Sequence, residues 1–150
     1  MVPVQLIKQC KIFKMFPENM VEQVAGIGIP VTYKAGEMLF NVDEPAHNLA
    51  VLMKGRVEIL TTKRTQFVPI HIVMPGEAFA LSSMITGRFV SAARAAEDSE
   101  VCALPVDKFT QIIEQDYKVA YLFMKQIAIL VSSRLLRIHY QLDATGPGFA

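Results

Sequence analysis

The spacing of apolar residues changes twice along the chain. Near the N-terminus, Met20, Val21 and Val24 follow Pro17 and Glu18, a pattern typical of a short helix with proline and an acid at its first turn. Beyond residue 30, short β-branched or apolar runs are separated by turns that contain glycine or proline, and each run predicts a strand. These runs cover residues 31–33, 37–40, 49–53, 56–60, 69–74, 91–95 and 100–104. The pattern therefore predicts an antiparallel sandwich or barrel preceded by helices.

Helical spacing returns near residue 105. Phe109, Ile112 and Ile113 fit a short helix with Asp107 as its N-cap, and a long helix is predicted over residues 117–142. Apolar residues of the long helix alternate by four and three, which is the spacing of a coiled-coil seam. The seam consists of Met124, Ala128, Val131, Leu135, Ile138 and Leu142.

The long helix also carries a second apolar stripe. Phe123, Ile127 and Leu130 lie on a different face from the seam, and a helix that is apolar on two faces needs cover on two sides. We expect the parent barrel to cover the second stripe and the same helix of a second copy to cover the seam, which predicts a homodimer. Burial of the whole helix in the core of a monomer is the alternative.

The composition is that of one globular domain. The 150 residues are 52% hydrophobic with a formal net charge of +1, a balance that gives no electrostatic support for binding nucleic acid or an anionic membrane through this segment. The N-terminus has no long apolar segment of the secretory type. The apolar run from residue 119 to 131 is interrupted by Lys125 and is too short to span a bilayer. We expect a soluble, cytoplasmic protein with no membrane partner, in which Cys10 and Cys102 are structural.

The sequence offers little for catalysis. His47, His71 and His139 have no metal-ligand spacing, and neither a Gly-x-Ser-x-Gly motif nor a phosphate-binding loop of the nucleoside-triphosphatase type occurs. We therefore expect no enzyme activity, no catalytic residue and no metal site.

Four segments in order carry the strongest signal. They are Tyr33–Phe40, Leu52–Ile59, Pro75–Gly87 and Ala95–Val101. They resemble the motifs of the cyclic-nucleotide-binding domain family, and the resemblance extends over about residues 10 to 142. It implies a mainly β fold with flanking helices: N-terminal helices, an antiparallel β-roll of jelly-roll type and a long C-terminal dimerisation helix. It also implies binding rather than catalysis.

The segment that resembles the family's phosphate-binding cassette keeps its frame and loses its charges. In the family, a Gly-Glu pair offers backbone N–H groups to the phosphate and a carboxylate to the ribose, while an arginine pairs with the phosphate. Here the pair falls on Ala80 and Leu81, and the arginine falls on Val90. Each lost hydrogen bond to a charged group is worth roughly 1.5–3 kcal/mol, so the resemblance implies weak or no binding of cyclic AMP and cyclic GMP. The implied ligand-binding positions are Ala80, Leu81, Ser82, Ser83, Val90, Ser91 and Ala92.

The leading hypothesis is a less polar pocket for an unidentified small-molecule effector, with no cofactor assigned. A shifted register would instead make Glu77 and Arg88 the functional pair and restore cyclic-nucleotide binding. Arg88 and Arg94 could also serve a different anion. A dimeric scaffold without a ligand, its pocket filled by side chains such as Leu81 and Val90, is a further alternative.

Haem binding is the last alternative, because some relatives hold haem in this region. Pro3, His71 and Cys102 are the residues that could contribute. The colour of the purified protein would test this hypothesis.

The end of the chain resembles regulators of the catabolite-activator/FNR type. Ser132 and Ser133 fall where such proteins contact the ligand from the long helix, although they also fit an ordinary helix surface. Residues 142–146, Leu-Asp-Ala-Thr-Gly, resemble the hinge that leads into a helix-turn-helix. We expect a sensor domain over residues 1–146 with a tail at 147–150 and no DNA-binding domain within this chain. DNA would be a partner only if a helix-turn-helix domain follows.

Overall fold

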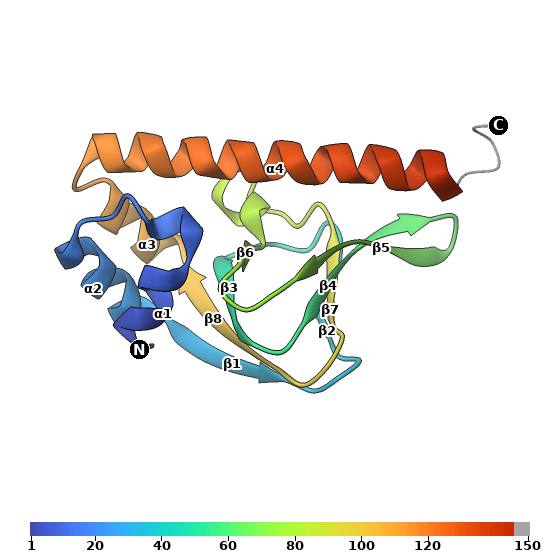
Figure 1. Ribbon diagram of the computed structural model, residues 1–150, viewed down its shortest axis with the longest axis horizontal. Helices are drawn as coiled ribbons and strands as arrows, with labels where there is room; N and C mark the ends of the chain where they lie inside the picture. Colours follow the sequence, from blue (N-terminus) through green and yellow to red (C-terminus); the bar gives the residue numbers. More distant parts are fainter. Residues whose placement is uncertain (146–150) are drawn as a thin grey trace.

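Helices at both ends of the chain flank a two-sheet β-roll (Figure 1). The computed structural model describes the backbone of residues 1–145 and the side chains of residues 1–140. The helices before the sheets are α1 (Val4–Gln9), the 3-10 helix η1 (Lys11–Phe13) and α2 (Glu18–Ile27). After the sheets come α3 (Val106–Ile113) and α4 (Tyr117–Thr145). Pro17 precedes α2 and Glu18 lies in its first turn, so proline and acid begin this helix as the sequence predicts.

Eight strands form two four-stranded sheets in which every pairing is antiparallel. One sheet has the order β1-β8-β3-β6 and the other the order β2-β7-β4-β5. The strands are β1 (Ile29–Tyr33), β2 (Met38–Phe40), β3 (Asn48–Lys54), β4 (Val57–Lys63), β5 (Gln66–Val73), β6 (Ala78–Phe79), β7 (Ala92–Ala95) and β8 (Ser99–Pro105). The predicted antiparallel β-roll with flanking helices is therefore confirmed.

The turn between β3 and β4 shows why its glycine is required. Gly55 has φ +93°, and a Cβ built there would lie 2.4 Å from the Ser99 hydroxyl oxygen and 2.5 Å from the Asp98 carbonyl oxygen. No other residue type fits this conformation and this contact without displacing the facing turn. The Ser99 hydroxyl is itself held by the Arg56 carbonyl at 3.2 Å and the Glu97 carbonyl at 2.8 Å.

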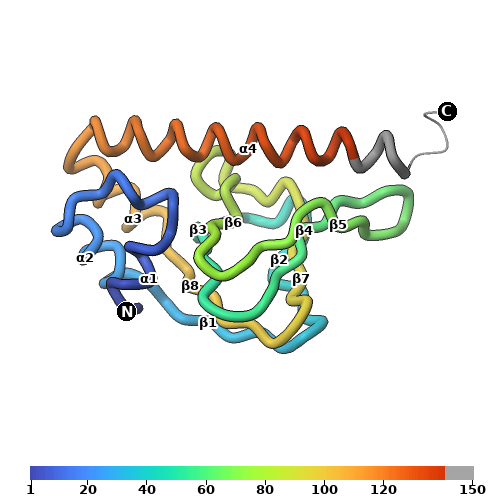
Figure 2. Tube along the Cα trace, viewed as in Figure 1, coloured from blue at the N-terminus to red at the C-terminus, as the bar shows by residue number. Residues whose placement is uncertain are grey.

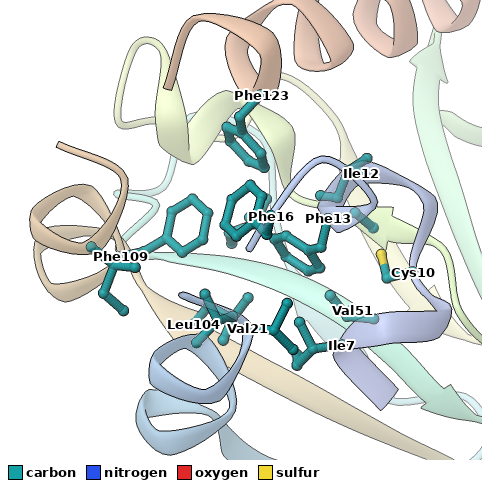
Figure 3. Packing of buried hydrophobic residues seen from close by; sticks show 14 of the residues in the cluster. Ile7, Cys10, Ile12, Phe13, Phe16, Val21, Val51, Leu104, Phe109 and Phe123 are labelled. Atoms are coloured by element: carbon teal, nitrogen blue, oxygen red, sulfur yellow. The ribbon is translucent and has the colours of Figure 1, made fainter. Parts of the chain in front are cut away.

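Two apolar cores lie side by side under α4. The first joins the helices to the inner residues of β3 and β8, and four phenylalanines form its centre, from η1, the loop after it, α3 and α4 (Figure 3). Phe109 and Phe123 meet edge to face with ring centroids 5.0 Å apart, and Phe13 and Phe16 do so at 5.3 Å. The second core fills the β-roll between the two sheets and includes Phe79, which is fully buried.

Helix α4 runs over both cores along the length of the molecule (Figure 2). Of the second predicted stripe, Phe123 and Ile127 are buried in the first core and Leu130 is partly buried against it, as expected for the face that the parent domain covers. Tyr117–Tyr140 has a mean hydropathy of 1.4 over its most apolar window and could span a membrane by length and composition alone. The apolar stretch is thus longer than the run considered in the sequence, although one face of it is packed on the parent domain.

The predicted seam is only partly free. Met124 and Ala128 are exposed, whereas Ile138 packs against the core of the β-roll. The reason is that a straight α-helix drifts by about 20° per heptad relative to a perfect seven-residue repeat. This drift brings the later seam positions towards the parent domain. Leu142 lies outside the described side chains.

Two local expectations were wrong. The residue at the N-cap of α3 is Pro105 and not Asp107, which lies in the first turn of the helix and accepts a hydrogen bond from the Lys108 N–H at 2.9 Å. The two-residue strand β6 was missed, since Ala78 and Phe79 are too short a run to show a period.

Candidate functional site

A cavity of about 380 Å³ lies between the β-roll and α4. Its wall comes from strands β2, β4 and β5 of one sheet, from the segment 80–91 and from the inner side of α4. The lining residues are mostly aliphatic or aromatic. They are Phe40, Ile59, Ile70, Ala80, Leu81, Ser82, Ile85, Thr86, Phe89, Val90, Ser91, Val131, Arg134, Leu135 and Ile138. The volume lies within the range of small-molecule sites, about 300–1,000 Å³.

The backbone of the cassette has the conformation that the family motif assigns to glycine. Ala80 has φ 59° and ψ 39°, in the left-handed region, and the 3-10 helix η2 (Leu81–Met84) begins directly after it. A residue with a Cβ in this region carries a cost of roughly 1–2 kcal/mol. The Ala80 carbonyl accepts hydrogen bonds from the Ser83 N–H at 3.1 Å and the Ser83 hydroxyl at 2.7 Å, which hold the turn in place.

The two residues that replace the charged groups lie in different environments. Leu81 is 4% exposed and packs into the first core as well as the cavity wall. Val90 is 71% exposed and lies at the edge of the cavity. Of the two, only Leu81 is a core residue. The ligand-free alternative required both side chains to fill the pocket, and Val90 does not do so.

The other cassette positions divide between the cavity and the interior. Ser82 and Ser91 line the cavity, and their hydroxyl groups have no hydrogen-bond partner among the described residues. Ser83 is buried and bonded to the turn. Ala92 is buried in β7 and does not line the cavity.

The arginines singled out in the sequence lie outside the cavity wall. The Arg88 guanidinium is exposed and donates to the Asp43 carbonyl. Arg94 pairs with Glu58 across neighbouring strands, with Nη2 and Oε2 2.8 Å apart. Glu77, the partner of Arg88 in the shifted register, also lies outside the lining.

A third arginine, which sequence reasoning missed, does line the cavity. Arg134 of α4 is part-buried and its Nη2 donates to the Ala78 carbonyl oxygen at 2.8 Å. Burial lowers the pKa of this guanidinium, and the negative charge of Glu77 opposes that shift. The signal was present in the sequence, because Arg134 follows Phe123, Ile127 and Leu130 on the core-facing stripe at helical spacing.

A polar cluster of Glu77, His71 and Arg137 ties β5 to α4 next to the cavity. His71 Nε2 lies 2.9 Å from Glu77 Oε2, and the other ring nitrogen contacts the Arg137 guanidinium. Glu77 Oε1 also accepts from the Met74 N–H at 3.2 Å. Desolvation lowers the pKa of His71; Glu77 opposes the shift, whereas the charges of Arg134 and Arg137 add to it.

The three residues considered for haem lie in different settings. Pro3 is exposed before α1, His71 belongs to the polar cluster, and Cys102 is buried in the first core. Desolvation raises the pKa of both Cys102 and Cys10 to about 11, so that these thiols stay protonated. Among the described residues that line the cavity there is no histidine, cysteine, methionine or tyrosine, and this donor set does not fit haem.

On α4, the two serines lie away from the cavity. Ser132 and Ser133 are exposed and do not line it. Val131 and Leu135 line it from the edge of the exposed stripe and are 38% and 54% exposed. These two residues therefore belong both to the cavity and to the surface where a second copy is expected.

Comparison with known proteins agrees with this architecture. Residues 30–116 match the family model of the cyclic nucleotide-binding domain. The transcriptional regulatory protein Btr of Bordetella pertussis is 27% identical over 134 residues, which are 87% of this chain and 53% of Btr. The chain thus spans about half the length of this relative.

Two solved structures share the fold. The sensor domain of the transcriptional regulator DNR from Pseudomonas aeruginosa has a TM-score of 0.75 at 19% identity, covering 87% of this chain and 89% of that one. The catabolite activator protein of Thermus thermophilus has a TM-score of 0.72 at 23% identity, covering 89% of this chain and 62% of the other.

Proposed function

Because this chain belongs to the cyclic nucleotide-binding domain family, we propose that it is the sensor and dimerisation domain of a transcription regulator whose effector is an apolar small molecule. The family is regulatory rather than enzymatic, and its structural neighbours include sensor domains of the catabolite-activator/FNR type. Cyclic AMP and cyclic GMP bind weakly or not at all in this account. DNA is a partner only if a helix-turn-helix domain follows residues 1–146, and the protein acts in the cytoplasm.

One observation carries the ligand part of the proposal. The cassette keeps its turn, with Ala80 in the left-handed region, yet the space in front of it is an apolar cavity of about 380 Å³. Phosphate and ribose would meet Leu81 and Val90 there, and neither side chain can form a hydrogen bond. A polar ligand group buried without a partner costs roughly 1–3 kcal/mol, whereas an apolar one gains from the same contact.

The exposed stripe of α4 supports dimerisation. Tyr121, Met124, Ala128, Val131 and Leu135 are all exposed and lie on one side of the helix. Covering such a stripe with the same stripe of a second copy removes apolar surface from water at coiled-coil spacing.

Two residues of α4 belong both to the proposed ligand site and to the proposed dimer interface. Val131 and Leu135 line the cavity and belong to the exposed stripe, so a molecule in the cavity touches the helix that forms the dimer. A ligand that binds one arrangement of the paired helices more tightly than another shifts the population towards it. This coupling is the proposed route from effector to output.

Ligand binding is tested by mapping isoleucine methyl groups by NMR during titration with naphthylmethanol, an uncharged apolar probe. Ile59, Ile70 and Ile85 line the cavity, whereas Ile112 and Ile113 lie in the first core and serve as internal controls. Shifts confined to the first group support the proposal. No shift at any isoleucine at saturating probe, or equal shifts in both groups, contradicts it.

Dimerisation is tested by sedimentation of Ala128→Asp, which adds a charge to the exposed stripe without touching the cavity. The matched control is Ile129→Asp, since Ile129 is the next residue and 50% exposed but faces away from the stripe. We expect Ala128→Asp to sediment as a monomer and the control to remain a dimer. A monomeric wild type, or dissociation by both variants, contradicts the assigned interface.

A further inference from the structure

Among the described residues that line the cavity, one is charged, Arg134. Its hydrogen bond to the Ala78 carbonyl uses one of five N–H donors. Among the described residues, no carboxylate lies within ion-pair distance of Arg134. The neighbouring carboxylate, Glu77, is engaged with His71 and lies outside the cavity wall.

A part-buried guanidinium with unused donors is an unusual component of an apolar wall. Removing a cation from water is costly unless an anion or several acceptors replace the water. Desolvation of this kind lowers the pKa of Arg134, and the charge of Glu77 offsets the shift only in part. The hydroxyl groups of Ser82 and Ser91 face the same cavity without a protein partner.

We propose that the effector is an organic carboxylate whose anionic group pairs with Arg134 and whose apolar remainder fills the cavity. The inference rests on the proposed function, because it requires a ligand in this cavity. The planar guanidinium matches a carboxylate through two parallel hydrogen bonds, and the hydroxyl groups of Ser82 and Ser91 are further donors among the residues that line the cavity.

Size and polarity narrow the class of ligand. A cavity of about 150 Å³ lined by Leu, Ile and Phe admits benzene, so the present volume of about 380 Å³ suits a body of two fused rings or a medium-length acyl chain. A nucleotide carries many polar atoms into a wall that is mostly aliphatic or aromatic and offers few hydrogen-bond partners. A carboxylate with a hydrocarbon body leaves one polar group to satisfy, and Arg134 satisfies it.

The test compares matched pairs of acids and alcohols by calorimetric titration of the full chain. The pairs are naphthoate with naphthylmethanol and octanoate with octanol, which differ in the charged group and share the apolar body. We expect the wild type to bind at least one acid about 10- to 100-fold more tightly than its alcohol, the factor that a hydrogen-bonded charge pair supplies. Arg134→Met should abolish that preference while the alcohol still binds.

Two further variants separate charge from folding. Arg134→Lys keeps the charge and should retain part of the preference for the acid. Arg137→Met removes an arginine one turn along the same helix that contacts His71 rather than the cavity, and it should leave the preference unchanged. Melting curves establish that each variant is folded.

The outcomes distinguish this inference from the proposed function. Equal affinity for acid and alcohol in the wild type, unchanged in Arg134→Met, overturns the carboxylate and leaves an apolar cavity that binds ligands. Absence of binding by all four probes overturns both. Binding of cyclic AMP that depends on Arg134 and exceeds the binding of the acids replaces the carboxylate by a cyclic phosphate and refutes the apolar effector as well.

Discussion

Restoring the arginine and the glutamate of the family cassette should change the stability of the protein by very different amounts, although the motif gives no reason to expect a difference. Val90→Arg places a long charged side chain at a position that is 71% exposed, where surface substitutions usually change stability by no more than about 0.5 kcal/mol. Leu81→Glu places a carboxyl group at a position that is 4% exposed and faces apolar neighbours. The first variant should fold like the wild type, and the second should be strongly destabilised.

The magnitude for Leu81→Glu follows from two terms. Losing the buried leucine side chain costs about 1.5–3 kcal/mol. A carboxyl group in such an environment has a raised pKa, and a rise from about 4.3 to about 7 corresponds to about 3.7 kcal/mol against the charged form. The sum, about 5–7 kcal/mol near pH 7, approaches the whole stability of many domains of this size.

The pH dependence separates the two terms. The folded variant binds more protons than the unfolded chain between those two pKa values, so its stability should rise as the pH falls from 7 to 5. Leu81→Gln loses the leucine without adding an ionisable group, and its deficit relative to the wild type should stay constant over the same range. Urea unfolding of the wild type and the three variants at both pH values provides the measurement, at one fixed protein concentration.

The same proteins test the functional side. Val90→Arg should bind cyclic AMP about 10- to 100-fold more tightly than the wild type, because it returns a charge-assisted contact to the phosphate. A Leu81→Glu variant as stable as Val90→Arg at pH 7 would refute the placement of Leu81 in the core. So would a deficit that does not change between pH 7 and pH 5.

Three further predictions concern the scaffold. Phe123→Ala should lower the free energy of unfolding by about 3–5 kcal/mol because the ring is fully buried among three other phenylalanine rings. Ile129→Ala, on the exposed side of the same helix, should change the free energy of unfolding by less than about 0.5 kcal/mol. Urea titrations compare the two variants, and similar losses would contradict the assigned faces of α4. The pKa of His71 is lowered in the folded protein, so near and below the ordinary histidine pKa of about 6.5 this side chain binds more protons in the unfolded chain than in the folded one. Acidification from pH 7 to 5 should therefore lower the melting temperature of the wild type more than that of His71→Gln. Equal losses in the two proteins would contradict this prediction. Gly55→Ala should lower the free energy of unfolding by about 2–4 kcal/mol, because it adds close contacts with two oxygen atoms to the cost of a positive φ. Gly36→Ala should lower it by about 1 kcal/mol, because Gly36 has a similar φ of +90° but open space around it. Equal losses in chemical denaturation would show that the close contacts at Gly55 do not contribute.

Much of the fold could be predicted because local signals and tertiary structure agree. The change from helical to alternating spacing near residue 30 marks the start of β1, and glycine at position 55 predicts the tight turn that the facing chain requires. The strand β6 and the N-cap of α3 could not be found in the same way. A two-residue strand has no period, and Asp107 has the chemistry of an N-cap but lies two residues after the N-cap position, Pro105.

The site was less accessible to sequence reasoning because its decisive feature depends on long-range packing. The cassette motif includes Ala80 and Leu81, which line the cavity, yet it does not reveal that Val90 is exposed. Arg134 lies more than 40 residues beyond the cassette and carries no motif. Only the position of α4 over the β-roll brings its guanidinium to the Ala78 carbonyl.

We propose that the cavity takes an apolar molecule in preference to a cyclic nucleotide. The most direct test is the melting temperature of the protein with cyclic AMP, cyclic GMP and naphthylmethanol, measured side by side. A site occupied at 100 times its Kd gains about 2.7 kcal/mol, which is a shift of several degrees in a domain of this size. We expect a shift with naphthylmethanol and none with either nucleotide. A shift with a cyclic nucleotide and none with naphthylmethanol would refute the apolar effector.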